Sequence, residues 1–302
     1  METNLRQAET KVVLEGVVAE KSMAVEADKD TGIDRIRGYI VVRTSPTNLV
    51  RVNVNSSKMT KNGTESKTYA GLLTVMNEYR SIADDGEDGA DIVRITNGTL
   101  NPYRSRQNGN EIISFTTNFF NRVQSKEEYN PRAEFELEGC IKSILPEVNS
   151  DGEETGRVKV SVWMPTYSGI EPIEMIANAD IADAVSDAFE VGQTAKFYGE
   201  IINDRKVTKI EIPVAIGKPK IETRTVYRNE MLITGATEPY ENKEDGDEGE
   251  IGNNGLPWAY NVDTIRKAVQ EREIAIANEG NTSTARTSSK PSGKSRGRSL
   301  GF

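Results

Sequence analysis

The sequence contains no histidine and a single cysteine, Cys140. Without histidine, the chain can form neither a Ser–His–Asp triad nor a histidine-based zinc site. With one cysteine it can form no intramolecular disulfide, which is typical of proteins that fold in a reducing compartment. These absences exclude the most common hydrolytic and zinc-dependent chemistries.

Long apolar runs are also absent. The chain has no run of about 18 apolar residues, which a transmembrane helix would need. The N-terminal stretch METNLRQAET lacks the apolar core of a signal peptide. We therefore expect a cytoplasmic protein, in the host cytoplasm if the protein is viral, and no membrane partner.

The acidic residues do not form a recognisable catalytic or metal site. They gather in polar loops such as 84–88, outside the apolar surroundings that separate the pKa values of a catalytic acid and base. This loop also lacks the ligand spacing of an EF-hand. Gly293-Lys294-Ser295 is similar to the end of a phosphate-binding loop, but Ser288 stands where that loop needs glycine. We therefore expect a protein that is not an enzyme and that binds no metal and no cofactor.

The first part of the chain has the element order of an OB-fold. Alternating apolar residues predict three strands, and apolar residues at helical spacing then predict one helix, at 11–20, 38–44, 49–54 and 67–82 in turn. A long hairpin follows at 91–123, with its turn at Asn108-Gly109 and its second strand running from Ile112 to Val123. Three strands, a helix and two strands make the five-stranded OB barrel.

The same order recurs after a short linker at Tyr129–Arg132. The expected strands and helix lie at 133–145, 156–164, 170–177, 180–189 (the helix), 193–202 and 207–212. The pair Glu15-Gly16 in the first strand recurs as Glu138-Gly139. The sequence therefore predicts a mainly β protein with two tandem OB-fold-like five-stranded barrels, each with one helix. The alternative is one larger β-sandwich of about ten strands.

Composition divides the chain further. We expect a first OB-fold-like domain at 1–128, a second at 133–237, an acidic linker at 238–256, a helix at 257–280 and a disordered basic tail at 281–302. The stretch 227–237 would add a strand to the edge of the second domain. The helix has Asn261 or Asp263 as a candidate cap and is expected to end near Gly280.

The hairpin carries a family resemblance. Gly98-Thr99-Leu100 is followed by Tyr103 and Arg104, then by a turn and a last strand. This pattern resembles the C-terminal strands of the OB domain in bacterial and phage single-stranded DNA-binding proteins. The resemblance covers about 30 residues. It implies single-stranded DNA as the partner, a role in phage DNA replication or recombination, and contacts with replication or recombination proteins through the C-terminal segments.

The C-terminal part departs from that family pattern. Those proteins typically end in an acidic tail. Here the acidic segment 238–250 is internal, and the segment 296–302 is basic and ends with Leu300-Gly301-Phe302.

Basic and aromatic residues are distributed over both predicted barrels. Aromatic rings stack on bases and guanidinium groups contact phosphates in single-strand-binding proteins. The candidate nucleic-acid-binding residues are Arg51, Lys58, Lys61, Arg94, Tyr103, Arg104, Arg106, Phe115 and Arg122 in the first barrel, and Lys159, Trp163 and Tyr167 in the second. The alternative for each ring is a place in the core, and for each charge a solvated surface.

Two other function classes fit the same sequence. A viral structural or assembly protein can also be built from β-barrels with extended arms. A protein-binding adaptor could use the acidic segment or the terminal helix. The leading hypothesis remains a non-catalytic single-stranded DNA-binding protein.

Overall fold

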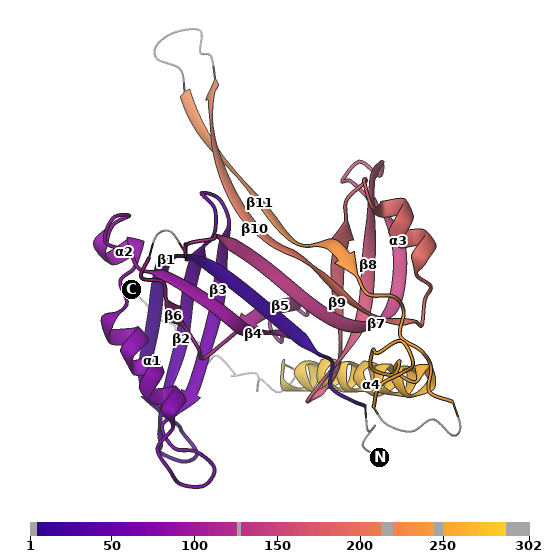
Figure 1. The fold of residues 1–302 in the computed structure, drawn as a ribbon, viewed down its shortest axis with the longest axis horizontal. Coiled ribbons are helices and arrows are strands. Elements are labelled where there is room, and N and C mark those ends of the chain that lie inside the picture. The colour runs from indigo at the N-terminus through magenta and orange to yellow at the C-terminus, as the bar shows by residue number, and fades with distance from the viewer. Residues whose placement is uncertain (1–4, 126–127, 213–219, 245–249, 288–302) are drawn as a thin grey trace, which may run out of the picture.

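The computed structural model describes residues 5–125, 128–212, 220–244 and 250–287. Figure 1 shows two β-lobes side by side, a two-stranded arm that rises from between them, and a long helix below one lobe. None of the described helices is long and apolar enough to span a membrane.

The first lobe is a closed five-stranded barrel, called barrel 1 below. Its strands are β1 (Thr10–Ala27), β2 (Asp34–Arg43), β3 (Leu49–Ser57), β4 (Ile92–Arg104) and β5 (Glu111–Thr116). Hydrogen bonding follows the order β1–β2–β3–β5–β4, and β4 returns to pair with β1. The pairing of β3 with β5 is parallel and the others are antiparallel. This closure is the Greek-key barrel of the OB-fold.

The second lobe, barrel 2, repeats this topology. Its elements are β7 (Arg132–Val148), β8 (Glu154–Thr166), β9 (Gly169–Ala177), the helix α3 (Ala182–Ala188), β10 (Thr194–Ile212) and β11 (Lys220–Ala236). Their order is β7–β8–β9–β11–β10, with β10 returning to β7 and β9 parallel to β11. The predicted mainly β fold of two tandem barrels is confirmed. A single sandwich is excluded because the strands close on themselves twice.

Alternation along the strands explains why each barrel buries one face. In β2, Ile36, Ile40 and Val42 are fully buried, while the side chains between them point outward. One apolar cluster extends through both barrels and includes Leu14 of β1 and Phe135 of β7. The barrels therefore share a core.

The two barrels are joined by their first strands. β1 pairs antiparallel with β7 from Thr10↔Leu137 to Glu15↔Arg132. Glu15 and Glu138 are both fully buried beside this pairing. Glu15 accepts hydrogen bonds from Arg94 Nε at 2.8 Å and from the Asn130 N–H at 3.0 Å. A buried carboxylate thus marks the same place in each first strand, which is why the Glu-Gly pair recurs in the sequence.

The partners of Glu138 mirror those of Glu15. Glu138 accepts hydrogen bonds from both Arg6 guanidinium nitrogens and, at 2.9 Å, from the Glu9 N–H. Arg6 precedes β1, so the chain before barrel 1 compensates a charge in barrel 2. In the same way Arg132, at the start of β7, approaches Glu15 to 3.9 Å. Each barrel therefore supplies an arginine to the buried carboxylate of the other.

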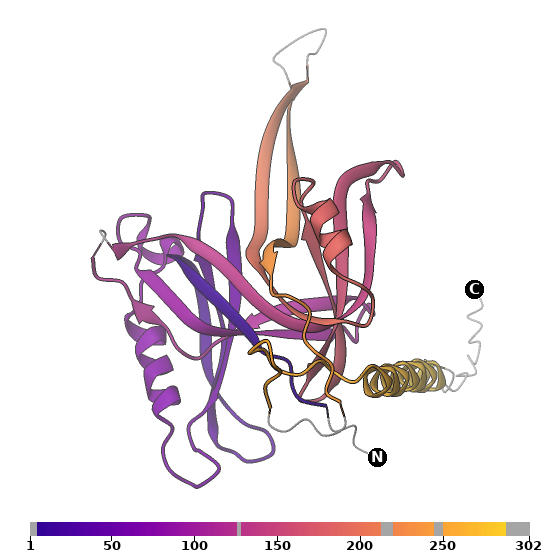
Figure 2. The ribbon, with the colours of Figure 1, turned by 45° about the vertical axis from the view of Figure 1, so that its right-hand side comes forward.

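A second contact fixes the root of the arm. Beyond barrel 2, β10 and β11 continue as a hairpin that stands clear of both lobes (Figure 2). At its root, the Asn203 amide donates to Leu49 O at 2.6 Å, and the Asn48 amide donates to Ile201 O at 2.9 Å. Thr47 Oγ1 donates to Asp204 at 3.0 Å. The loop between β2 and β3 of barrel 1 thus holds the base of a hairpin that belongs to barrel 2.

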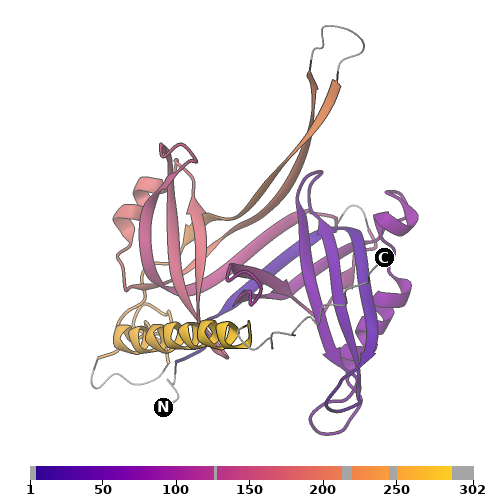
Figure 3. The ribbon, with the colours of Figure 1, turned by 180° about the vertical axis from the view of Figure 1, so that it is seen from behind.

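The long helix α4 (Val262–Thr287) lies against barrel 2, as seen from behind in Figure 3. Asn261 caps it, because its side chain accepts from the Thr264 N–H at 3.0 Å. A small apolar cluster of its own attaches the helix, with Ile265 and Ala268 packed against Cys140 and Ile170. The helix therefore covers part of barrel 2, and it reaches barrel 1 through the ion pair of Arg272 with Glu111 of β5 at 2.7 Å.

Several sequence predictions of local structure were wrong. The expected helix at 67–82 is two helices, α1 (Lys67–Glu78) and α2 (Ile82–Asp85), because Tyr79 is extended and Ser81 caps a new turn. Barrel 1 therefore carries two helices. The second hairpin strand ends at Thr116, and the separate strand β6 (Asn121–Arg122) pairs with β4.

Barrel 2 also differs from the predicted pattern. The stretches 193–202 and 207–212 form one continuous strand, β10, and Asn203 and Asp204 bind the loop of barrel 1 where a turn was expected. The fifth strand is β11, so 227–237 belongs to the barrel and is no added edge strand. The C-terminal helix continues to Thr287, beyond Gly280. The rest of the expected disordered tail, 288–302, lies outside the described residues.

The buried carboxylate of Glu15 makes the fold sensitive to acid. Burial raises the pKa of Glu15, but the hydrogen bonds from Arg94 and the Asn130 N–H outweigh it, so this pKa lies below its usual value. Its contribution to stability is present above the unfolded-state pKa of about 4.3 and is lost as the pH falls through the folded-state pKa. We expect Glu15→Gln to lower the free energy of unfolding by about 2–3 kcal/mol at pH 7.

Urea unfolding of both proteins at neutral and acid pH measures this effect. The difference between wild type and Glu15→Gln should shrink in acid. The matched control is Glu26→Gln, which changes an exposed residue of the same strand. A difference that stays constant with pH would contradict the assignment.

Candidate nucleic-acid interface

The outer face of β2 and β3 gathers arginine, tyrosine and asparagine. Because Ile36, Ile40 and Val42 point inward, the alternate positions Arg35, Arg37, Tyr39 and Arg43 point outward. β3 places Arg51, Asn53 and Asn55 on the same face, since Val41↔Arg51 and Tyr39↔Asn53 are direct partners. The face therefore offers cations, an aromatic ring and amides together.

At the centre of this face Arg51 lies over Tyr39. The guanidinium carbon is 3.7 Å from the ring centroid, a close cation–π contact. Arg51 is exposed and has no carboxylate partner among the described residues. The Tyr39 hydroxyl donates to Glu20 at 2.6 Å, which raises the pKa of this phenol and holds the ring in place. The pair is a flat, cationic and solvent-facing platform.

The other arginines of the face are tied to carboxylates. Arg35 and Arg37 lie 3.0 and 3.8 Å from Asp28, and Arg43 forms a two-pronged ion pair with Glu87. At the far end of β3, Lys58 lies 3.4 Å from Asp34. Arg51 is therefore the cation of this face that is left for a ligand.

The platform continues across the barrel as a polar track. Asn53 pairs with Thr116 of β5, and Thr116 in turn hydrogen-bonds Thr99 of β4 at 2.9 Å. Along β4 the outward positions are then Asn101 and Tyr103. We call this surface the barrel-1 track, and its residues are Tyr39, Arg51, Asn53, Thr116, Asn101 and Tyr103. None of the six is buried and none is acidic.

The far end of the track opens into a groove. This groove has a volume of about 850 Å³ and lies between the β4–β5 hairpin, the start of β9 and helix α4. Tyr103, Arg104 and Arg106 line it on the hairpin side. On the opposite side Arg272 of α4 is held by Glu171 at 2.7 Å. The structure thus brings together these three sequence-predicted residues and places Tyr167, 96% exposed, in the turn just before β9.

In barrel 2 the outer face of β8 and β9 corresponds to the outer face of β2 and β3 in barrel 1, and its charges are paired. The first strand of each barrel has a β-bulge where it pairs with the second strand, between Val18 and Glu20 in β1 and between Ile141 and Ser143 in β7. Superimposing these two bulges aligns the strands of the two barrels residue by residue. The Val41↔Arg51 pair of barrel 1 then corresponds to Ser161↔Glu174 in barrel 2. An acidic residue therefore occupies the position of Arg51.

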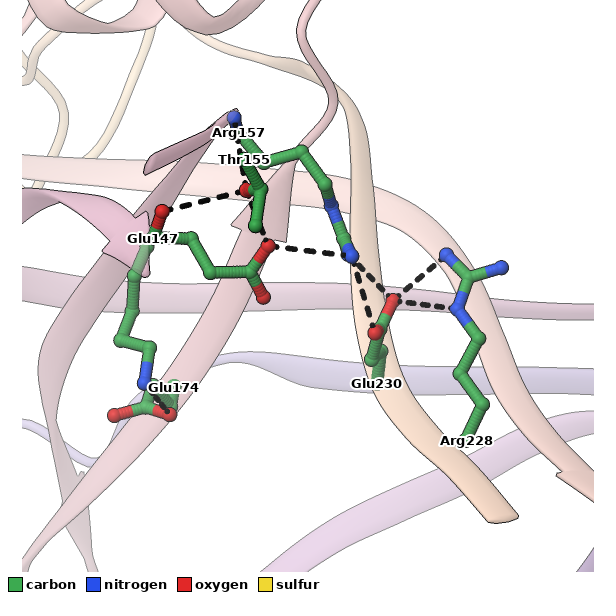
Figure 4. Close-up of polar contacts among 7 residues, drawn as sticks. Glu147, Thr155, Arg157, Glu174, Arg228 and Glu230 are labelled. Atoms are coloured by element: carbon green, nitrogen blue, oxygen red, sulfur yellow. Dashed lines mark hydrogen bonds and ion pairs between the residues drawn. The ribbon is translucent and has the colours of Figure 1, made fainter. Parts of the chain in front are cut away.

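Ion pairs neutralise the cations around Glu174, and Figure 4 shows them. Lys159 is 2.9 Å from Glu174. Arg157 bridges Glu147 at 3.4 Å and Glu230 at 2.6 Å, and Arg228 also reaches Glu230 at 2.7 Å. A phosphate would have to displace these carboxylates. The cations Lys159, Arg157 and Arg228 on the outer face of barrel 2 are therefore already paired within the protein.

Trp163 is also occupied within the protein. Its half-buried ring packs against the cluster that attaches α4, and Lys142 Nζ lies 4.5 Å from the ring centroid. The structure gives Trp163 a packing role beneath the helix.

The remaining candidates are spread over barrel 1. Arg94 binds the buried Glu15, and Arg122 lies 3.1 Å from Asp91 with its guanidinium over the Tyr79 ring. Phe115 packs against the core, and Lys61 is exposed in the loop before α1. Arg94 and Arg122 therefore have structural partners, which isolated residue types could not reveal.

Sequence reasoning missed Tyr39, the other half of the platform. The signal was present in the stretch DRIRGYIVVR, where arginine and tyrosine occupy alternate positions between apolar residues. Reading that alternation as an outward basic and aromatic face would have placed Tyr39 beside Arg51.

Comparisons with known proteins give one family and a few distant folds. Residues 9–282 match the model of the family described as YorF. A deletion mutant of the single-stranded DNA-binding protein from Thermus aquaticus is 11% identical over 80% of this chain and 99% of that one, with a TM-score of 0.49. The wild-type protein from Thermus aquaticus is 10% identical over 80% and 98%, with a TM-score of 0.48.

A replication protein A heterotrimer bound to single-stranded DNA is 8% identical over 75% of this chain and 51% of that one, with a TM-score of 0.22. No protein with a curated description matches the chain. At these identities and TM-scores the structural likenesses decide neither the fold nor the function.

Two aromatic residues of the hairpin should respond differently to truncation. Phe115 packs against the core, so Phe115→Ala should lower the free energy of unfolding by about 3 kcal/mol. Tyr103 is 47% exposed, so Tyr103→Ala should change the free energy of unfolding by no more than about 0.5 kcal/mol. Urea unfolding of the two variants measures both values. Equal losses would place both rings in the core and remove Tyr103 from the track.

Proposed function

This chain belongs to the YorF family, a name that states no activity, and we propose that it binds single-stranded DNA without catalysing a reaction. The observation that carries the proposal is the barrel-1 track, which begins at the stacked pair of Arg51 and Tyr39 and whose six residues include no acid. Its acidic neighbour Glu20 is occupied by the hydrogen bond from the Tyr39 hydroxyl.

The chemistry of the track suits an unpaired strand. Bases of a single strand have free faces, which stack on tyrosine rings and guanidinium planes. The Arg51–Tyr39 platform and Tyr103 offer such surfaces at the two ends of the track. Between them the side chains of Asn53, Thr116 and Asn101 can hydrogen-bond base edges.

The location on the barrel supports the same proposal. OB-folds bind oligonucleotides on the face of their second and third strands and at the loop between the fourth and fifth. In barrel 1 these places hold the Arg51–Tyr39 platform and the groove of Tyr103, Arg104 and Arg106. Barrel 2 then acts chiefly as support, because its corresponding face is internally paired. The setting proposed with this function is phage DNA replication or recombination.

Strand preference tests the proposed function directly. The full chain should bind a single strand more tightly than a blunt duplex of the same length, because only the single strand has unstacked bases. Its affinity should fall with salt, with a slope of log K against log salt of about −0.7 for each phosphate neutralised. Fluorescence anisotropy with labelled oligonucleotides measures both. Equal binding to the two forms at physiological salt would refute the proposal.

Substitutions on the track locate the site. Tyr39→Ala should weaken single-strand binding by about 1–3 kcal/mol, the value of one stacked base. Arg51→Ala should weaken it as well and reduce the salt slope by about 0.7. The matched control is Lys159→Ala in barrel 2, where the lysine is already paired with Glu174 and little binding should be lost.

Thermal melts of each variant serve as the stability control. Because Tyr39 and Arg51 are surface residues, their substitution should leave the melting temperature nearly unchanged. If Lys159→Ala weakens binding as much as Arg51→Ala, the site is not confined to barrel 1.

A further inference from the structure

Beyond its root, the arm formed by β10 and β11 has no partner strand among the described residues. The last backbone contacts with barrel 1 are the bridge of Asp204 with Asn48 and the bond from the Arg205 N–H to Thr47 O, and from Lys206↔Val226 to Ile212↔Lys220 the two strands pair only with each other. Among the described residues, β7 pairs with β10 no further than Glu200, and β9 pairs with β11 only at Leu232 and Ile233. An isolated two-stranded hairpin is marginally stable in water. A free arm of this length therefore needs an explanation in terms of what it contacts.

The surface of the arm is apolar as well as cationic. Val207, Ile221 and Tyr227 are 51%, 60% and 64% exposed. The described residues of the arm, 205–212 and 220–228, contain six Lys or Arg and two Asp or Glu, a net charge of +4, whereas the whole chain has a formal net charge of −9. Lys206 and Arg224 have no carboxylate partner among the described residues. Positive charge is thus concentrated on one projecting element of an acidic protein, which favours a polyanion over a second copy of the chain.

The dimensions of the arm fit duplex DNA. At about 3.4 Å per residue the free part, 206–212 with its partner strand, is roughly 20 Å long, the length of about six base pairs. A two-stranded β-ribbon is narrow enough for the major groove of B-DNA. The barrel-1 track, by contrast, is a broad surface suited to unstacked bases.

The root of the arm lies beside the barrel-1 track. Asn203 binds Leu49 O at 2.6 Å, and Leu49 is two residues before Arg51 on β3. The bonds of Asn48 and Thr47 to the root hold the arm at a fixed place relative to that strand. A nucleic acid that left the track at Arg51 would therefore meet the arm next.

We propose that the ligand is a junction between single-stranded and double-stranded DNA, with the single strand on the barrel-1 track and the adjoining duplex held by the β10–β11 arm. This inference rests on the proposed single-strand binding and adds a duplex contact to it. The basic side chains Lys206 and Arg224 contact duplex phosphates.

The test compares three probes in fluorescence anisotropy. They are a single strand of about 20 nucleotides, a blunt duplex of about 15 base pairs, and the same single strand attached to that duplex. The wild-type chain should bind the tailed duplex about tenfold more tightly than the single strand, because the arm neutralises additional phosphates.

An arm-shortened variant isolates the contribution of the arm. Since Arg205 and Tyr227 are direct partners, replacing 206–226 by Asn-Gly closes the hairpin with a tight turn. This variant should bind the single strand as well as wild type does and lose the preference for the tailed duplex. The double variant Lys206→Glu/Arg224→Glu should do the same without shortening the backbone. Lys267→Glu, on the exposed side of α4, is the matched control and should keep the preference.

Each result decides between the possibilities. Failure of wild type to bind the single strand refutes the proposed function itself. Binding of the single strand with equal affinity for the tailed duplex refutes only the junction. Loss of single-strand binding in both arm variants, with unchanged thermal melts, would make the arm part of the single-strand site and overturn the junction. Light scattering measures the oligomeric state of wild type and of the arm-shortened variant. A dimer that only wild type forms would identify the arm as a contact between copies of the chain and overturn the junction.

Discussion

The relative position of the two barrels depends on the pairing of β1 with β7. This pairing joins two barrels edge to edge in one continuous sheet, and their apolar interiors merge into one cluster. The pairing also buries two carboxylates, Glu15 and Glu138, that would be costly without compensation. The arginines that approach them from the opposite barrel, Arg132 and Arg6, make each barrel electrostatically dependent on the other. Together with the bonds of Asn203 and Asn48 at the arm root, this pairing places the arm of barrel 2 beside the barrel-1 track.

Two barrels of the same topology carry different surfaces. In barrel 1, Arg51 stacks on Tyr39 and stays free of carboxylates among the described residues, whereas in barrel 2 Glu174 stands at the corresponding place and binds Lys159. Helix α4 covers the region around Trp163 of barrel 2. Strand pairing depends mainly on the backbone and the inward side chains, so the outward side chains of a duplicated barrel can diverge without cost to the fold. This freedom explains how one barrel becomes a binding surface while the other becomes a support with a long arm.

The loops between the fourth and fifth strands differ in the same way. In barrel 1 this loop is a short hairpin that lines a groove closed by α4, and in barrel 2 it is the arm. Both emerge beside the loop between the second and third strands of the opposite barrel, at Gly169 in one case and at Asn48 in the other. The proposed single-strand and duplex contacts are therefore continuous across the boundary between the barrels, through Leu49 and Asn203.

The sequence by itself determined the class of fold and the repeat. Inward apolar alternation, the Asn108-Gly109 turn and the recurring Glu-Gly pair depend on neighbours a few residues apart, so they could be read without coordinates. That the hairpin residues Tyr103, Arg104 and Arg106 line one groove could be anticipated for the same reason, since they are close in sequence as well as in space. Only the tertiary structure decided which cations remain available. Arg94 and Lys159 have the same residue character as Arg51, but their charges are matched by Glu15 and Glu174 from other strands. The continuity of β10 through Asn203 was likewise decided by partners in barrel 1, because hydrogen bonds to Asn48 and Leu49 replace the turn that the local sequence favours.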